Sequence, residues 1–86
     1  MKTTDYIADS LINLGVKNVY AITGGAVMHI LDSFKKKKLN IIFCHHEQAA
    51  LLAATTEARV NNTIGCAVVT QGPGVTNAIT GLAAAW

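Results

Sequence analysis

The ten residues IIFCHHEQAA, Ile41 to Ala50, decide the fold, because they join an apolar strand directly to a helix. The run Ile41–Cys44 contains only apolar side chains, which is typical of a strand buried on both faces of a parallel sheet. From Glu47 to about Val60 the chain is rich in Ala and Leu and favours a helix. A short strand that leads straight into a helix indicates an α/β fold.

The same alternation of strands and helices extends in both directions along the chain. Short strands that alternate with helices predict a three-layer α/β/α fold with a parallel sheet and right-handed crossovers. The expected elements are a helix from about Thr4 to Gly15, a strand over Val19–Ile22, a helix from Val27 to about Lys36, the strand Ile41–Cys44, the helix from Glu47, a strand over Ile64–Thr70 and a helix over Val75–Trp86.

Composition and charge exclude several classes of protein. Of the 86 residues, 51% are hydrophobic and 14% are charged, which argues against disorder. The net charge of +2 is too weak to indicate nucleic-acid binding. Beyond Arg59 only Cys66 is ionisable, but Gly72–Gly74 and several Asn and Thr interrupt this stretch too often for a membrane span. Because Met1–Asp5 leads into an amphipathic pattern and not into an apolar signal peptide, we expect a cytoplasmic protein.

The uncharged last third of the chain predicts a missing neighbour. A small soluble domain needs charged residues on its surface. We therefore expect another part of the protein or a second subunit to cover residues 60–86. We also expect the chain to be truncated at Trp86.

Three segments follow the expected strands and carry the residues of most chemical interest. They are Thr23–Ala26, His45–Gln48 and Gln71–Asn77. In open parallel sheets, ligands bind at the carboxyl ends of the strands. We therefore expect these three segments to converge on one ligand site.

Glu47 has two interpretations. An acid in the first turn of a helix is stabilised by the helix dipole and needs no further role. Alternatively, a carboxyl group in a cleft of low dielectric constant suits proton exchange with a ligand nitrogen. Position alone favours the first interpretation.

Other chemistries have weaker support. His45 and His46 are adjacent, so in a strand they point to opposite faces, and no spacing typical of a metal site is present. Cys44 and Cys66 form no CxxC motif and are expected to be free buried thiols. The stretch Gly72–Asn77 resembles the dinucleotide-binding pattern GxGxxG only in part, because Asn replaces the third Gly.

Three motifs together resemble the N-terminal pyrimidine-binding domain of thiamine diphosphate-dependent enzymes, in the acetolactate synthase-like group. They are Gly24–Ala26, the HEQAA motif His46–Ala50, and Gly65–Ala78, which contains GPGVTN. The pair HEQAA and GPGVTN is more specific than either motif alone. The resemblance implies that residues 1–86 are the N-terminal part of that domain. It also implies an incomplete thiamine diphosphate-binding fold, whose first strand lies between the second and the third.

The resemblance also implies which residues act. Glu47 would be the catalytic residue, whose carboxyl hydrogen-bonds N1′ of the aminopyrimidine, favours the imino tautomer and so supports loss of the thiazolium C2 proton. Gly25, Pro73 and Asn77, together with Glu47, match positions that bind the cofactor. Mg²⁺ would be bound through an absent domain, so no metal ligand is expected in this chain, and the dependence on FAD is left open.

Substrate and partners follow from the same resemblance. It implies a 2-keto acid substrate for carboligation or decarboxylation, and a second subunit at the cofactor site in a homodimer or homotetramer. The 86 residues alone are expected to be inactive. Thr55–Glu57 departs from the more usual Asp/Glu-Gly-Tyr, and Thr23 replaces a frequent Pro, which leaves the exact substrates open. A Rossmann-like nucleotide-binding module and a non-catalytic interaction module of the same fold are the alternatives.

Overall fold

The fold alternates helices and strands in the expected order. The computed structural model describes residues 3–24, 27–70 and 72–85. No helix in this described part of the chain is long and apolar enough to cross a membrane. The elements are α1 (Thr3–Asn13), β1 (Asn18–Ala21), α2 (Met28–Lys36), β2 (Asn40–Phe43), α3 (Glu47–Asn61), β3 (Ala67–Val68) and α4 (Pro73–Ala85).

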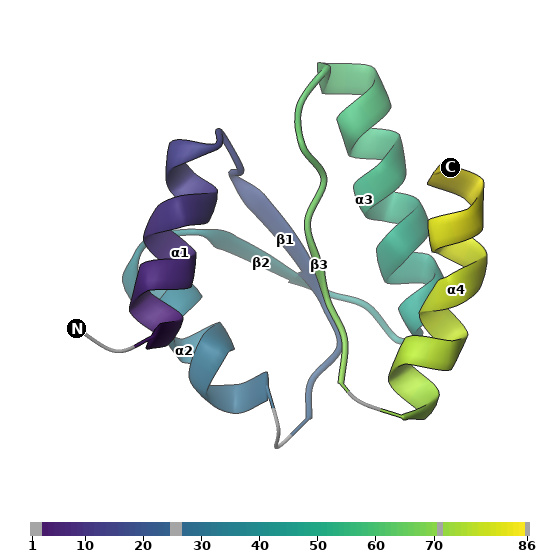
Figure 1. The fold of residues 1–86 in the computed structure, drawn as a ribbon, viewed down its shortest axis with the longest axis horizontal. Coiled ribbons are helices and arrows are strands. Elements are labelled where there is room, and N and C mark those ends of the chain that lie inside the picture. The colour runs from purple at the N-terminus through teal and green to yellow at the C-terminus, as the bar shows by residue number, and fades with distance from the viewer. Residues whose placement is uncertain (1–2, 25–26, 71, 86) are drawn as a thin grey trace.

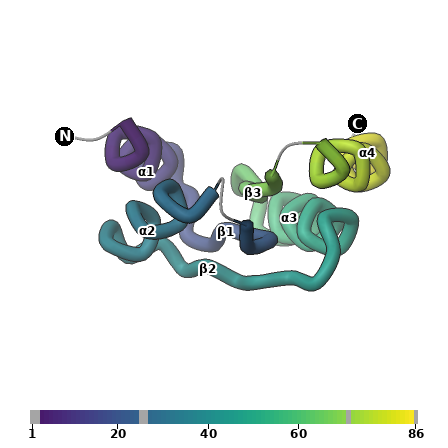
Figure 2. Tube along the Cα trace, turned by 90° about the horizontal axis from the view of Figure 1, so that it is seen from below, coloured from purple at the N-terminus to yellow at the C-terminus, as the bar shows by residue number. Residues whose placement is uncertain are grey.

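The three strands form one open parallel sheet in the order β2-β1-β3. Val19 lies opposite Ile41 on one side of β1, and Tyr20 lies opposite Ala67 on the other. Helices α1 and α2 cover one face, α3 covers the other, and α4 lies beside α3 (Figures 1 and 2). The predicted three-layer architecture, with the first strand between the second and third, is confirmed.

The main hydrophobic core lies between the sheet and the α1–α2 layer. Phe34 of α2 and Val19 of β1 are its largest fully buried apolar side chains. Ala8, Val16 and Leu39 complete the buried cluster. Burying a side chain such as Phe or Val contributes about 1.5–3 kcal/mol. This cluster therefore anchors β1, the strand that carries both neighbours.

Two strand predictions need correction. Residues 41–44 do not form a strand buried on both faces, since Ile42 and Phe43 are 37% and 57% exposed. The reason is that β2 is an edge strand, and α3 crosses from it to cover β1 and β3. The third strand is also shorter than Ile64–Thr70, because only Ala67 and Val68 reach pairing distance of β1.

Helices α3 and α4 pack side by side in parallel (Figure 1), with small residues between them. On α4 the buried positions are Gly74, Ala78 and Gly81. A Cβ atom built on Gly81 would overlap the Cβ atom of Leu51 on α3. The close approach of the two helices therefore requires glycine at position 81.

An adjoining side of α4 is uncovered by the described residues. Val75, Ile79 and Leu82 are spaced as one helical stripe and are 53%, 55% and 62% exposed. Such a stripe is consistent with the expectation that another part of the protein covers the last helix. That expectation stays a prediction.

Replacing Gly81 with Ala tests the close contact between α3 and α4. We expect Gly81→Ala to lower the free energy of unfolding by about 2 kcal/mol. The overlap with Leu51 places the cost at the upper end of the about 1–3 kcal/mol typical of overpacking, and a gain of about 1 kcal/mol in helix propensity offsets part of it. Urea unfolding followed by circular dichroism measures the change. Thr80→Ala, on the exposed side of α4, is the control and should stay within about 0.5 kcal/mol; equal or higher stability of Gly81→Ala would contradict the packing.

Candidate functional site

The segments that follow the three strands meet at one edge of the sheet, as expected. Thr70, just beyond β3, joins two of them. A Cβ atom built on Gly24, after β1, would lie 3.7 Å from Thr70 Cβ, and one built on Gly74 would lie 3.2 Å from Thr70 Cγ2. The same position on Gly74 is 3.5 Å from Glu47 Oε2, which belongs to the segment after β2. Gly24, Thr70, Gly74 and Glu47 therefore form a continuous row.

Glu47 is the first residue of α3, and His46 caps that helix. The backbone N–H of Gln48 donates to His46 Nδ1 at 3.0 Å. This bond satisfies one of the free N–H groups at the helix start. His46 therefore has a structural role, and the Glu47 carboxyl does not have to serve as the cap.

The Glu47 carboxyl points across to α4. Asn77 Nδ2 donates to Glu47 Oε1 at 3.3 Å. Because Gly74 has no side chain, Oε2 can approach the backbone of α4 on the same side. Glu47 is half-buried and Asn77 is exposed, so the pair lies at the surface of the edge, within reach of a ligand.

The parallel arrangement of α3 and α4 gives the site its electrostatics. Both helices begin at this edge, so two positive helix ends face the same place. The Glu47 carboxyl lies at the start of α3, beside the first turn of α4. The arrangement can hold one carboxylate and one amide in fixed positions beside a bound molecule.

The structure places most of the other residues selected from the sequence. Pro73 is the first residue of α4, where its missing N–H costs no helical hydrogen bond. Gly25 lies outside the described residues. Cys44 and Cys66 are half-buried free thiols, and burial raises the pKa of the Cys66 thiol. Neither thiol is among the contacts that hold Glu47 in place.

The departure at residues 55–57 lies on the part of α3 away from Glu47. The hydroxyls of Thr55 and Thr56 donate to carbonyls one turn back in the same helix. Glu57 accepts a hydrogen bond from Asn18 at the start of β1. Glu57 therefore fastens α3 to the amino end of the sheet, opposite the edge where Glu47 lies.

Two hollows beside α3 do not include Glu47 in their lining. One of about 520 Å³ lies between α3 and α4 around Leu51 and Leu82, and one of about 560 Å³ lies on the other side of α3 around Tyr20 and Val60. Their size alone does not make either one the ligand site, because the polar groups converge elsewhere. Among the described residues, no group of three His, Cys, Asp or Glu could hold a metal ion.

Comparison with known proteins identifies the family. Residues 1–86 match the family described as "Thiamine pyrophosphate enzyme, N-terminal TPP binding domain". The chain belongs to this family. The predicted resemblance to the N-terminal domain of thiamine diphosphate-dependent enzymes is thereby confirmed, and the Rossmann-like alternative is set aside.

Curated relatives of this TPP-binding domain support the same grouping. The chain is 43% identical over 83 residues to the acetolactate synthase large subunit of Buchnera aphidicola, covering 95% of the chain and 14% of the relative. It is 42% identical over 83 residues to acetolactate synthase isozyme 3 large subunit of Escherichia coli, with the same coverage. It is 40% identical over 74 residues to 2-hydroxyacyl-CoA lyase 2 of Danio rerio, covering 86% of the chain and 12% of the relative. The TPP-binding chain therefore spans about one seventh of these proteins.

Two residues that make long-range contacts in this TPP-binding domain were not selected from the sequence. Thr70 was expected only as the end of a strand, and Arg59 only as part of a helix. Both make contacts to residues distant in the sequence, Thr70 to Gly24 and Arg59 to Ala84. Hydrophobic periodicity carries no signal for such contacts; the only sequence signal for Thr70 is its place at a strand end before Gly72.

Replacing Asn77 with Asp tests the geometry at this edge. The new carboxylate would face that of Glu47, so we expect a loss of about 1 kcal/mol in unfolding free energy at pH 7. The loss should shrink as the pH falls through the ordinary carboxyl range near about 4. Unfolding measured at pH 7 and pH 4 gives both values.

Thr76→Asp is the control, because it adds the same charge one residue earlier on α4. Thr76 is exposed and its hydroxyl donates to the Gly72 carbonyl, not to Glu47. We expect its stability to stay within about 0.5 kcal/mol of wild type at pH 7. Equal effects of the two substitutions would show that Asn77 does not face Glu47.

Proposed function

We propose that residues 1–86 are the N-terminal part of the pyrimidine-binding domain of a thiamine diphosphate-dependent enzyme that acts on 2-keto acids. The single observation that carries this proposal is the Glu47 carboxyl at the sheet edge, 3.3 Å from the Asn77 amide. Membership of the TPP-binding family supports the choice of cofactor. When bound, thiamine diphosphate supplies the carbanion chemistry at the substrate carbonyl.

In this proposal Glu47 holds a proton at a ring nitrogen of the cofactor. A carboxyl group can accept a hydrogen bond when ionised and donate one when protonated, so it can exchange a proton with that nitrogen. Glu47 is half-buried, which leaves part of the carboxyl open to a ligand. His46 already caps α3, so proton exchange at Glu47 does not disturb the helix start.

Asn77 and Gly74 would orient this carboxyl. The Asn77 amide fixes Oε1, and the bare backbone of Gly74 leaves room for Oε2. A carboxyl held on one side presents its remaining lone pairs in a fixed direction. Pro73 and Gly25 complete the proposed cofactor-binding set.

Other parts of the protein would complete the site. The described residues line the proposed cofactor site from one side only. This supports a homodimer or homotetramer in which a second subunit lines the other side. The Mg²⁺ ion and the diphosphate would be bound outside this chain. The 86 residues alone would then lack activity, and carboligation or decarboxylation of a 2-keto acid would need the full-length enzyme.

The substitution Glu47→Gln tests the proposed role of the carboxyl. Gln keeps the size of Glu and can accept the Asn77 hydrogen bond, but it cannot exchange a proton with the ring nitrogen. We expect turnover of the full-length enzyme to fall at least about 10²-fold. Stability should fall by only about 0.3–1 kcal/mol, the value of an acid at a helix start. Steady-state kinetics and thermal unfolding of the same preparation measure the two effects.

Glu57→Gln is the matched control. Glu57 lies on the same helix but bonds to Asn18 at the other end of the sheet, and Gln can accept that bond as well. We expect its turnover to stay near wild type. If Glu47→Gln and Glu57→Gln have the same turnover, Glu47 is only a helix-start residue and the catalytic assignment is wrong.

A further inference from the structure

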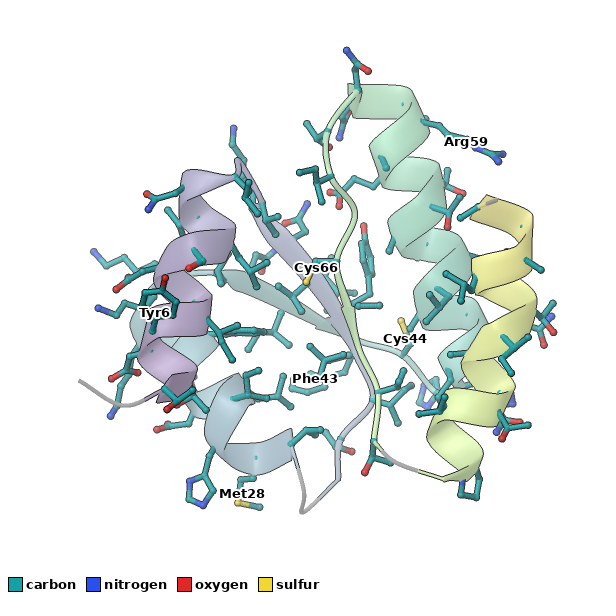
Figure 3. The ribbon with its side chains drawn as sticks, in the orientation of Figure 1. Tyr6, Met28, Phe43, Cys44, Arg59 and Cys66 are labelled. Atoms are coloured by element: carbon teal, nitrogen blue, oxygen red, sulfur yellow. The ribbon has the colours of Figure 1, made fainter. Side chains whose placement is uncertain are left out.

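Arg59 ties the far ends of α3 and α4 together. Its Nη2 atom donates to the carbonyl oxygen of Ala84 at 2.8 Å. Figure 3 shows the Arg59 side chain extending from the last turns of α3 toward the C-terminal end of α4. Carbonyl groups in the last turn of a helix have no partner within the helix, and a cation there is favoured by the dipole. The contact therefore holds the end of α4 from outside that helix.

Contacts at three levels fix how far α4 lies along α3. They are the Asn77–Glu47 hydrogen bond at the start, the contact of Gly81 with Leu51 in the middle, and the Arg59–Ala84 hydrogen bond at the end. Gly81 lets the helices approach closely in the middle, where Leu51 lies against it. The two hydrogen bonds at the ends are exposed and directional, and they add to this packing in fixing the axial position.

The bond at the Glu47 end is sensitive to that position. Its length of 3.3 Å is already beyond the common 2.7–3.2 Å range for N–H···O bonds. One residue of an α-helix corresponds to about 1.5 Å along the axis, so a slide of one residue would lengthen this bond between the helices to about 3.6 Å, which is too long for a hydrogen bond. The Arg59 bond at 2.8 Å is the shorter of the two and lies within the common range.

We propose that Arg59 is a positioning residue of the cofactor site, which holds α4 at the axial position where Asn77 reaches Glu47. The inference rests on the proposed function of Glu47. Arg59 itself is far from the edge and touches no ligand in this account. Arg59 acts through α4 and Asn77, so its effect on the affinity for the cofactor should depend on Asn77.

A double-mutant cycle on thiamine diphosphate affinity tests this dependence. The full-length apoenzyme is titrated with thiamine diphosphate and Mg²⁺ by calorimetry, so the readout is binding and not turnover. We expect Arg59→Ala to weaken affinity about threefold to tenfold, the size of coupling found between residues that act together. In the Asn77→Ala background the same change should have almost no effect.

Two further variants make the cycle interpretable. Arg59→Lys keeps the charge and one donor, so it should recover part of the affinity, and it replaces Arg59→Ala in the cycle if the Ala variant does not fold. Val60→Ala alters the neighbouring exposed side chain and should bind as wild type does.

Independent effects would overturn the inference. If Arg59→Ala weakens binding equally with and without Asn77, or lowers the melting temperature while affinity is unchanged, Arg59 has only a structural role. Turnover of Glu47→Gln is measured alongside. A Glu47→Gln variant with wild-type turnover refutes the proposed function. If Glu47→Gln loses turnover as expected but the effects of Arg59→Ala and Asn77→Ala on affinity are additive, the positioning role is wrong and the proposed function stands.

Discussion

The parallel packing of α3 against α4 is the constraint on which the site depends. Two parallel helices place like dipole ends together, which is unfavourable unless charges compensate them. Glu47 lies where both helices begin. At the other end, Arg59 near the end of α3 donates a hydrogen bond to a carbonyl oxygen in the last turn of α4. Gly81 lets the helices approach closely enough for both contacts to form. The same residues that stabilise the pair therefore also set the position of the Glu47 carboxyl.

Much of the fold could be predicted from the sequence. Apolar runs that alternate with helical spacing identified every helix and strand, and the resemblance supplied the strand order. The extent of burial could not be predicted, because an edge strand and a central strand have similar apolar sequences. Ile42 and Phe43 illustrate this: they look like core residues, but α3 leaves β2 to cover the neighbouring strands.

For the site, the sequence predicted the residues but not the contacts between them. Glu47 and Asn77 come from motifs, and their place after two strands indicated that they converge. Their hydrogen bond depends on the side-by-side placement of two helices, which no local pattern determines. Thr70 and Arg59 entered only with the structure, since each contacts a residue far away in the sequence. His46 serves as a helix cap, which its place directly before the helix did not by itself reveal.

Exchange of the C2 proton of thiamine diphosphate tests the central claim most directly, because it reports on the proton at the cofactor before any substrate is involved. The exchange is followed by NMR in deuterated buffer with the full-length enzyme and Mg²⁺. If the Glu47 carboxyl handles the proton of the ring nitrogen, exchange in Glu47→Gln should be slower than in wild type by at least about 10²-fold. Exchange at the wild-type rate in a folded Glu47→Gln enzyme that binds the cofactor would contradict the account.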